Sequence, residues 1–530
     1  MEEICSASEK LNDVNDDLPS IATFLAGKNV FITGGTGFLG TVLIERLLSA
    51  TPEIGTIYVL IRDKNGHSAE SRIERLMSKV IFDRLSETDK AKVQPVLGEL
   101  SEPNFAINQE LLPKILSDVN IVYHVAATIR FNSFLATAIK INLVGTQVAI
   151  NFSKSLRNLT SFIYVSTAFC NSCYLNQGIK EQVYPSAHDP HDMIKLVDSN
   201  NNENELPKTG TKELQDILGI HPNTYTFTKQ LAENLILKEM QNLPAGILRP
   251  SIVYGTFKDP DEGWVGSANS GHIGFLAGYS KGLFRTMGGD ADSVMDLIPC
   301  DYVVNAAIAL SWFVATRPIE TPEVIHCTSG EINPLTFGTY CKMLNKATKK
   351  HPNDFIICQP KVSVRTGFRY TLFIYLFHFI PALLLYIPEH LLPASKKSAR
   401  KTIDYVRIFD NGIKAFDYFV SKNFHYNMKN SLRVLDSLKL EDAQKYNYNV
   451  KYCDWAKYFE TQIVGIRYYF YKESKHTSIR HNIMWHIYGV VQFLWYVGGL
   501  LIIKVVLSTF LPTTVAVAIA LIILMFVKWI

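Results

Sequence analysis

A strand, a glycine-rich turn and a helix follow one another near the start of the chain, and this succession most constrains the fold. Asn29-Val30-Phe31-Ile32 predicts a short buried strand, and 41–50 carries apolar residues at helical spacing. Glycine permits a tight turn and close approach of backbone to a pyrophosphate, and the helix N-terminus offers free N–H groups to it. In this context the turn predicts a dinucleotide site made by Thr33, Gly34, Thr36, Gly37, Phe38, Leu39 and Gly40.

The length of the chain, 530 residues, exceeds what one core supports and predicts two or three units. After a polar lead-in over 1–26, strand-length apolar runs alternate with helical patterns. We therefore predict an α/β fold over 27–350, a Rossmann-type doubly wound parallel sheet with a smaller substrate subdomain. The net charge of +4 gives no case for nucleic acid, and the eight scattered cysteines predict no metal site and a reducing compartment.

The end of the second predicted strand bears on the choice between NAD and NADP. The apolar run 56–61 is followed by Arg62, with Lys64 close behind. An acidic residue at this place binds the free ribose of NAD, whereas a cation suits the 2′-phosphate of NADP. We therefore predict NADPH as the cofactor, with Arg62 as a ligand. Asp63, beside Arg62, keeps NAD open as the alternative.

Small and polar residues follow the next buried strand, 120–125. Ala126 and Ala127 would let the nicotinamide ribose approach the end of the sheet, although small residues also serve plain core packing. Asn142 lies on the next predicted helix. It would stiffen the site through a water link to Lys229, or else make an ordinary polar contact inside its helix.

Catalytic residues are predicted where the strand 162–165 ends and on a later helix. Ser166 and Thr167 stand at the carboxyl end of this strand, where ligands of open α/β sheets bind. Tyr225 and Lys229 are four residues apart and so share one helix face. A lysine cation near a tyrosine lowers the tyrosine pKa from about 10. We predict that Tyr225 protonates a substrate carbonyl oxygen, which Thr167 or Ser166 hydrogen-bonds, while NADPH delivers hydride to the carbon.

These residues resemble the extended short-chain dehydrogenase/reductase superfamily, and further motifs resemble one branch of it, the fatty acyl-CoA reductases. The similarity covers about residues 28–473. The motifs that carry it are Val165-Ser166-Thr167-Ala168-Phe169-Cys170-Asn171, Leu248-Arg249-Pro250-Ser251-Ile252-Val253, Gly263-Trp264, Ile298-Pro299-Cys300-Asp301-Tyr302-Val303-Val304-Asn305, Asp454-Trp455 with Tyr458, and Gly465-Ile466-Arg467-Tyr468-Tyr469.

The resemblance implies NADPH-dependent reduction of long-chain fatty acyl-CoA to a primary alcohol and CoA, by two hydride transfers through an aldehyde. Such alcohols are wax and ether lipid precursors. The resemblance also implies cofactor contacts by Glu99 and by Pro250, Ser251 and Ile252, and a mostly helical C-terminal domain over 355–473. Glu99 stands where the family usually has Asp, and Gly266-Ser267 where it tends to have Asp-Asn. Related reductases often pair through Rossmann-domain helices, which leaves a homodimer open.

Two other functions stay open. A membrane-bound sterol or other lipid dehydrogenase or reductase would share Tyr225, Lys229 and a membrane segment, but it would not explain the motif 465–469. A catalytically silent membrane tether could keep the Rossmann fold for binding alone. The intact Tyr225, Lys229 and turn glycines argue against this third function, because a silent protein need not retain all of them.

The C-terminal part of the chain is apolar enough to predict membrane attachment. Between Ile483 and Val527 the only Asp, Glu, Lys or Arg is Lys504. Two runs result, 484–503 and 505–527, and each is long enough to cross a bilayer, as one crossing or as a hairpin. The basic flank predicts that the catalytic domain faces the cytosol. We expect the membrane to be that of the endoplasmic reticulum, or alternatively that of the peroxisome. This flank comprises Lys472, Lys475 and Arg480.

Two internal segments carry less specific predictions. The segment 182–220 is rich in Asp, Asn and Pro and predicts an inserted loop near the site, as a lid or as a disordered excursion. The run 370–388 lacks Asp, Glu, Lys and Arg. It predicts a hydrophobic hairpin at the bilayer or over the acyl tunnel, or else a core helix. A basic group follows it, Lys396, Lys397, Arg400 and Lys401.

Overall fold

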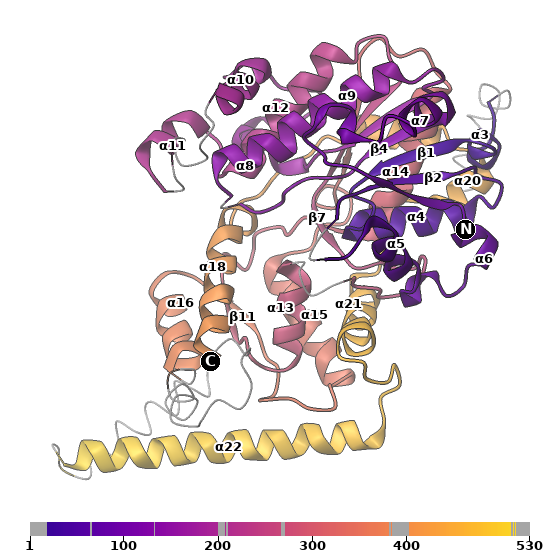
Figure 1. Ribbon diagram of the computed structural model, residues 1–530. Coiled ribbons are helices and arrows are strands. Elements are labelled where there is room, and N and C mark those ends of the chain that lie inside the picture. Colours follow the sequence, from indigo (N-terminus) through magenta and orange to yellow (C-terminus); the bar gives the residue numbers. More distant parts are fainter. Residues whose placement is uncertain are drawn as a thin grey trace.

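Seven parallel strands form one central sheet, which occupies the upper half of the molecule in Figure 1. The computed structural model describes residues 18–63, 66–131, 133–199, 207, 210–266, 271–380, 383, 402–509, 512 and 515. The strand order is β10-β6-β5-β4-β1-β2-β3. The strands are β1 (Asn29–Thr33), β2 (Ile57–Ile61), β3 (Val93–Leu97), β4 (Val119–His124), β5 (Ser161–Val165), β6 (Ala245–Pro250) and β10 (Glu323–Cys327). This arrangement confirms the predicted Rossmann-type sheet.

Helices cover both faces of the sheet, because alternate side chains of each strand point to opposite faces. In β1, Val30 and Ile32 enter one hydrophobic core and Phe31 enters the other. The first core is completed by α3 (Ile21–Leu25), α4 (Phe38–Ala50), α5 (Ala69–Met77), η1 (Val80–Phe82) and α14 (Cys300–Ala315). The second is completed by η2 (Pro103–Ala106), α7 (Leu112–Asp118), α8 (Leu135–Ile139), α9 (Gly145–Ser155) and α12 (Thr224–Glu239).

Many of the remaining elements build a smaller, mostly helical region below the sheet (Figure 1). Two short parallel pairs belong to it, β7 (Ile252–Tyr254) with β9 (Leu297–Pro299), and β8 (Thr286–Gly288) with β11 (Ser363–Arg365). Its helices are α13 (Gly271–Ser280), α15 (Phe337–Lys350), α16 (Gly367–Ile374), η5 (Tyr375–Phe379), α18 (Thr402–Val420), η6 (Val450–Tyr452), α21 (Trp455–Gly465) and η7 (Ile466–Phe470). Two later helices lie beside the sheet instead: α19 (Lys429–Asp436) packs against β10 and α14, and Asp442 of α20 (Leu440–Lys445) accepts from Ile21 N of α3 (2.8 Å). The predicted helical C-terminal region is therefore present.

The segment 182–220 differs from the predicted loop, because it contains two helices, α10 (Pro190–Ser199) and α11 (Lys212–Leu218). Thr211 caps α11 by accepting a hydrogen bond from Leu214 N (3.3 Å). Gly219, with φ +57°, ends it. Met193 of α10 is buried in the second core. Both helices are short, so the capping residues were the signal to follow.

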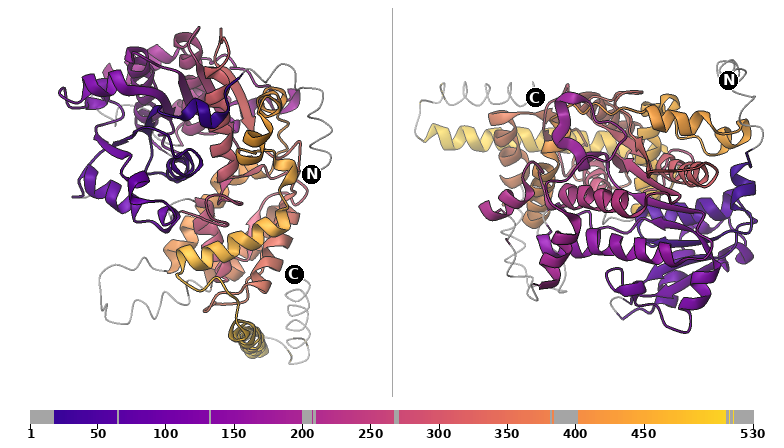
Figure 2. Two further views of the ribbon diagram at one scale, coloured as in Figure 1. Left: turned by 90° about the vertical axis from the view of Figure 1, so that its right-hand side faces the viewer. Right: turned by 90° about the horizontal axis from the view of Figure 1, so that it is seen from above.

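The long helix α22 (Ile479–Ser508) follows the C-terminal domain and covers the first predicted membrane run. In Figure 1 and in the left view of Figure 2 it lies at the end of the molecule opposite the layer of α8 and α12. Within the described ranges, no helix is both long and apolar enough to cross a membrane. The run 505–527 lies largely outside those ranges, and so do residues 384–401, with their basic group.

Two glycines far apart in the sequence bring the C-terminal domain against the reductase domain. A Cβ added to Gly465, at the end of α21, would lie 1.8 Å from Gly263 O. Gly263 has φ +71°, and its own Cβ would lie 2.2 Å from Thr461 O. Nearby, Tyr458 donates to Gly255 O (2.7 Å) and Gln462 Nε2 to Thr256 O (2.9 Å). The motifs around 263 and 465 thus form one backbone contact.

We expect Gly465→Ala to lower the free energy of unfolding by about 1–3 kcal/mol, because the added methyl group overlaps a carbonyl oxygen. Gly412→Ala is the matched control, since Gly412 also lies in a helix and its added Cβ would meet nothing within 4 Å. That control should be neutral or stabilising by up to about 1 kcal/mol. Denaturant unfolding of the purified proteins measures both. Equal midpoints for the two variants would show that the loop at 263 moves away without cost.

Candidate active site

The glycine turn between β1 and α4 lies at the carboxyl end of the sheet, where the strand order reverses between β4 and β1 and where open α/β sheets bind ligands. Gly34 has φ +75°, and a Cβ there would lie 2.7 Å from Ala126 N. Gly37 N donates to Gly34 O (2.9 Å), and α4 starts at the next residue. Only glycine fits this close approach. As at every helix N-terminus, the first N–H groups of α4 lack acceptors within the helix.

Thr33, Ala126 and Ala127 join the end of β1 to the loop after β4. Thr33 is fully buried, and its hydroxyl pairs with His124 Nδ1 (2.8 Å) and accepts from Ala126 N (3.2 Å). Burial, together with the charge of Lys229, lowers the pKa of His124 to about 3, so this imidazole is neutral. Thr33 therefore positions the loop after β4 from inside the sheet, while Ala126 and Ala127 lie across from Gly34.

Two arginines lie side by side near the carboxyl end of β2. Arg62 follows this strand, and Arg72 of α5 was not predicted from the sequence. Arg62 lies 3.6 Å from Glu99 Oε2 in an ion pair. Arg72, on α5, donates to Arg62 O and, at 3.5 Å, to Thr36 Oγ1. Burial and the charge of Arg62 lower the pKa of Arg72. Arg62, Arg72, Thr36 and Glu99 thus meet beside the glycine turn, whereas Lys64 lies outside the described residues.

Phe38 and Leu39, also predicted as cofactor residues, pack on protein at the start of α4. Phe38 stacks on Trp264 with ring centroids 5.4 Å apart. Leu39 packs against the first core. A Cβ on Gly266 would lie 2.6 Å from the ring of Phe38, so the loop that departs from the family pattern reaches the glycine turn. Ser267, the other residue of that departure, lies outside the described ranges.

Three predicted catalytic residues meet at the carboxyl end of β5. Lys229 is buried on α12, and its Nζ donates to Val165 O (2.6 Å) and lies 4.4 Å from the ring centroid of Tyr164. Thr167 caps the following helix η4 (Ala168–Gln177) by accepting from Phe169 N, and it also hydrogen-bonds Tyr225. The adjacent Ser166 is buried, and its amide donates to Leu248 O (2.8 Å). Thr167, Tyr225 and Lys229 therefore share one site.

The electrostatics of this site differ from the prediction in one respect. Burial raises the pKa of Tyr225, and the hydrogen bond with Thr167 only partly opposes that rise. Burial lowers the pKa of Lys229 to about 7, against the pull of the Glu233 carboxylate. The predicted lowering of the Tyr225 pKa by Lys229 is thus outweighed by desolvation. Tyr225 is therefore protonated at neutral pH, which suits a residue that gives a proton.

Asn142 and the residues after β6 surround the site without touching Lys229 directly. The Asn142 amide accepts from Thr128 N (2.8 Å) and donates to Thr228 Oγ1 (3.0 Å), so its contacts reach the loop after β4 and α12 and do not lie inside its own helix. The water link to Lys229 stays a prediction. Pro250 ends β6, and Ile252 begins β7. The buried hydroxyl of Ser251, between them, has no hydrogen-bond partner among the described residues. A buried polar group of this kind calls for a partner such as a ligand.

The described residues fit a nicotinamide dinucleotide. The glycine turn lets phosphates approach the backbone closely at the N-terminus of α4. The Ser251 hydroxyl offers an unused donor, and the arginine pair suits the adenosine end. Thr167, Tyr225 and Lys229 lie at the same sheet edge, where the nicotinamide would meet a substrate.

Solved structures share this fold at low identity. The terminal R domain from the myxalamid PKS-NRPS biosynthetic pathway superposes with a TM-score of 0.55 at 17% identity, covering 85% of this chain and 93% of that domain. The reductase (R) domain of a non-ribosomal peptide synthetase from Mycobacterium tuberculosis gives 0.55 at 16% identity, covering 88% and 95%. These similarities show a common architecture.

The fold and site define a nicotinamide-dependent reductase of the extended short-chain dehydrogenase class. Two family models, both described as "Male sterility protein", match residues 32–307 and 377–473. A Drosophila melanogaster protein named as a fatty acyl-CoA reductase is 46% identical over 511 residues, covering 96% of this chain and 93% of the relative. Fatty acyl-CoA reductase 1 of Rattus norvegicus is 33% identical over 467 residues, covering 86% and 87%. The chain belongs to the fatty acyl-CoA reductase family, which confirms the resemblance seen in the sequence.

Proposed function

We propose that this protein reduces long-chain fatty acyl-CoA to a primary fatty alcohol and CoA, using two molecules of NADPH. The observation that carries the proposal is the meeting of Thr167, Tyr225 and Lys229 at the end of β5, in a chain whose relatives are named as fatty acyl-CoA reductases. Thr167 and Tyr225 provide two hydroxyls at one place, which is what a carbonyl oxygen needs for orientation and protonation.

The chain's own residues handle the proton and the developing charge. Nicotinamide, when bound, supplies hydride to the carbonyl carbon. Thr167 orients the carbonyl oxygen, and Tyr225 gives its proton to that oxygen as negative charge develops there. The ammonium group of Lys229, held by Val165 O, lies on the same face of α12 and stabilises the tyrosinate left behind. A proton from water then restores Tyr225.

Two rounds of this chemistry account for the alcohol. Protonation and hydride addition at the thioester give a hemithioacetal, whose C–S bond breaks to release CoA and leave an aldehyde. The same residues then reduce the aldehyde to the alcohol. The Cys170 thiol is not needed as a nucleophile, and burial, together with the Glu233 charge, raises its pKa well above the usual value.

We expect the protein in membranes to convert acyl-CoAs to alcohols with two NADPH oxidised per alcohol, measured by mass spectrometry over saturated and unsaturated chains of increasing length. Tyr225→Phe should lose about 10²–10⁴-fold in turnover while it still folds and binds NADPH. Tyr123→Phe, which removes a hydroxyl from the buried β4, is the control that keeps activity. Absence of any product from folded, NADPH-binding protein would contradict the proposal, and aldehyde alone would limit it to the first reduction.

NADPH is proposed over NADH because Arg62 and Arg72 place two like charges side by side. A 2′-phosphate between them would relieve their repulsion and accept hydrogen bonds from both. We expect Arg72→Ala to raise the KM for NADPH about tenfold or more and to leave the KM for NADH nearly unchanged. Arg75→Ala, exposed on the same helix, is the control. Equal effects of Arg72→Ala on the two cofactors would contradict the 2′-phosphate assignment.

We also infer that the C-terminus attaches the protein to the endoplasmic reticulum membrane, or alternatively the peroxisomal membrane, with the catalytic domain in the cytosol. The apolar runs 484–503 and 505–527 support this inference. So do exposed apolar side chains on α22, such as Ile479 (79% exposed) and Phe493 (62%). A homodimer through Rossmann-domain helices stays a prediction.

A chain that ends before Met484 should be released from membranes by salt or carbonate washing, whereas the full chain should need detergent. Fractionation followed by immunoblotting measures this difference. If the shortened chain still needs detergent, the exposed apolar side chains of α16 and η5 become the attachment site instead. Those side chains belong to Phe368, Leu372, Tyr375 and Leu376.

A further inference from the structure

A buried ion pair lies one helical turn beyond Lys229, and the predicted mechanism does not use it. Glu233 of α12 and Arg249 of β6 are both fully buried. Arg249 Nε donates to Glu233 Oε1 (2.9 Å), and Arg249 Nη2 donates to Glu233 Oε2 (2.6 Å). Tyr225, Lys229 and Glu233 are spaced at four-residue intervals and so form one stripe along α12. The ion pair therefore fixes the same helix face that carries the catalytic residues.

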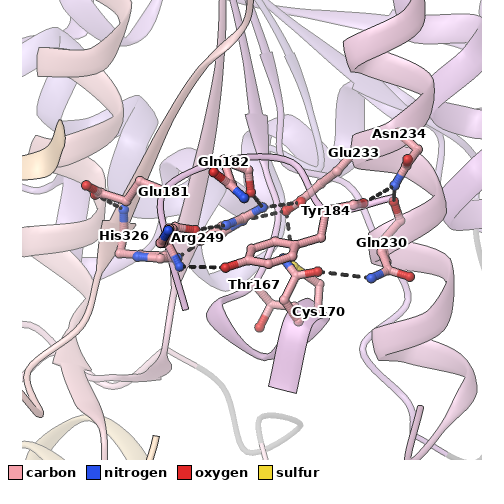
Figure 3. A network of polar contacts seen from close by, with 12 residues as sticks. Thr167, Cys170, Glu181, Gln182, Tyr184, Gln230, Glu233, Asn234, Arg249 and His326 are labelled. Atoms are coloured by element: carbon pink, nitrogen blue, oxygen red, sulfur yellow. Dashed lines mark hydrogen bonds and ion pairs between the residues drawn. The ribbon is translucent and has the colours of Figure 1, made fainter. Parts of the chain in front are cut away.

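All five N–H donors of Arg249 have partners. Besides Glu233, Nη2 donates to Gln182 O (2.7 Å), and Nη1 donates to Lys180 O (3.2 Å) and contacts His326 Nε2 (3.3 Å). Figure 3 shows Arg249 between Glu233 and His326. A guanidinium has five donors in a rigid fork, so lysine could not make this set of contacts. Arg249 thus clamps α12 to β6, to β10 and to the segment 180–182.

A second chain of contacts ties the same carboxylate to the helix that Thr167 starts. Cys170 Sγ donates to Glu233 Oε1 (3.2 Å) and accepts from Asn171 Nδ2 (3.3 Å). Asn171 Oδ1 accepts from Gln230 Nε2 (3.0 Å), which returns to α12. The circuit therefore links η4, directly after Thr167, with α12 at two neighbouring positions, and Figure 3 shows Cys170, Glu233 and Gln230 of this circuit.

Several titratable side chains surround Lys229, and Glu233 is the one whose negative charge favours the ammonium form. From β4, His124 is neutral, because burial lowers its pKa to about 3. From β5, burial raises the pKa of Tyr164, and from η4 burial raises that of Cys170, so both are protonated. Tyr225, on α12 itself, is protonated as well. The field of Glu233 thus opposes the burial that would otherwise discharge Lys229.

We propose that Glu233, clamped by Arg249, is a positioning residue that seats Tyr225 beside Thr167 and keeps Lys229 charged during reduction. The inference rests on the proposed function. A buried ion pair adds little stability compared with well-packed apolar side chains, so its presence here is explained by the site it serves. Neither side chain touches the substrate in this role.

The test compares Glu233→Gln with the wild-type protein. Charged Lys229 is required, so activity falls as the pH rises through its pKa. Loss of the Glu233 charge lowers that pKa, so the alkaline limb of kcat/KM should move down by about one pH unit or more. We expect kcat to fall about 10- to 100-fold, with the KM for acyl-CoA nearly unchanged, because misplaced catalytic groups slow chemistry more than binding.

The matched control is Glu473→Gln, which breaks another largely buried ion pair. Glu473 accepts from Lys281 Nζ (2.8 Å) and Asp354 N (3.1 Å), away from the sheet edge. This variant should lose stability without moving the alkaline limb. If Glu233→Gln loses activity with the limb in place, as a purely structural defect would cause, the proposal is overturned.

A double variant, Glu233→Met with Arg249→Met, keeps the test decisive should the single variant not fold. It removes both charges together and so leaves no unpaired buried ion, a change that proteins often tolerate. It should move the limb in the same direction as Glu233→Gln. An unmoved limb in this variant would also overturn the proposal.

The pH dependence of unfolding separates failure of the inference from failure of the proposed function, because it needs no substrate. Folded Lys229 loses its proton near pH 7, whereas the unfolded chain keeps it to about 10.5. Below pH 7 the folded protein carries the full free-energy cost of burying a charged Lys229. This cost falls as the pH rises from about 7 to about 10.5, so the free energy of unfolding increases over that range. In the double variant this increase should begin at lower pH. An unchanged onset contradicts the role of Glu233 even in a protein that reduces no acyl-CoA.

Discussion

The burial of one ammonium group, that of Lys229, is the constraint on which the rest of the site depends. A lysine under a parallel sheet edge loses its hydration, so the surrounding chain must replace water with a carbonyl, an aromatic face and a nearby carboxylate. The carbonyl is Val165 O, the aromatic face is the ring of Tyr164, and the carboxylate is that of Glu233. The first two come from neighbouring residues of β5 and the third from α12, which packs beside the end of that strand.

The same sheet explains why binding and chemistry share one edge. Strands β1, β4, β5 and β6 run in the same direction, so their carboxyl ends all open on one side. The glycine turn follows β1, Ala126 follows β4, Thr167 follows β5 and Ser251 follows β6. These residues therefore gather at one edge of the sheet. The loop around Gly266, within the reductase domain, reaches the glycine turn through Phe38.

Much of this arrangement could be predicted from the sequence because its signals are local. The strands have apolar runs of the right length. Tyr225 and Lys229 have helical spacing, and they come after a strand that Ser166 and Thr167 follow. Arg72 and the Glu233–Arg249 pair could not be found this way, because their roles depend on contacts between distant elements. Burial also reversed the expected shift of the Tyr225 pKa, and burial is not visible in spacing. The helices α10 and α11 were missed because they are short and lie in a stretch rich in Asp, Asn and Pro.

The contact between Gly263 and Gly465 also orders events during synthesis. The reductase domain emerges from the ribosome first, but the surface around Gly263 has its natural cover only after the chain has been made through residue 465. Until then the carbonyls of Gly255 and Thr256 lack the donors that Tyr458 and Gln462 provide. The first two-thirds of the chain therefore emerges with these carbonyls uncovered, and α21 provides their donors once it has been made.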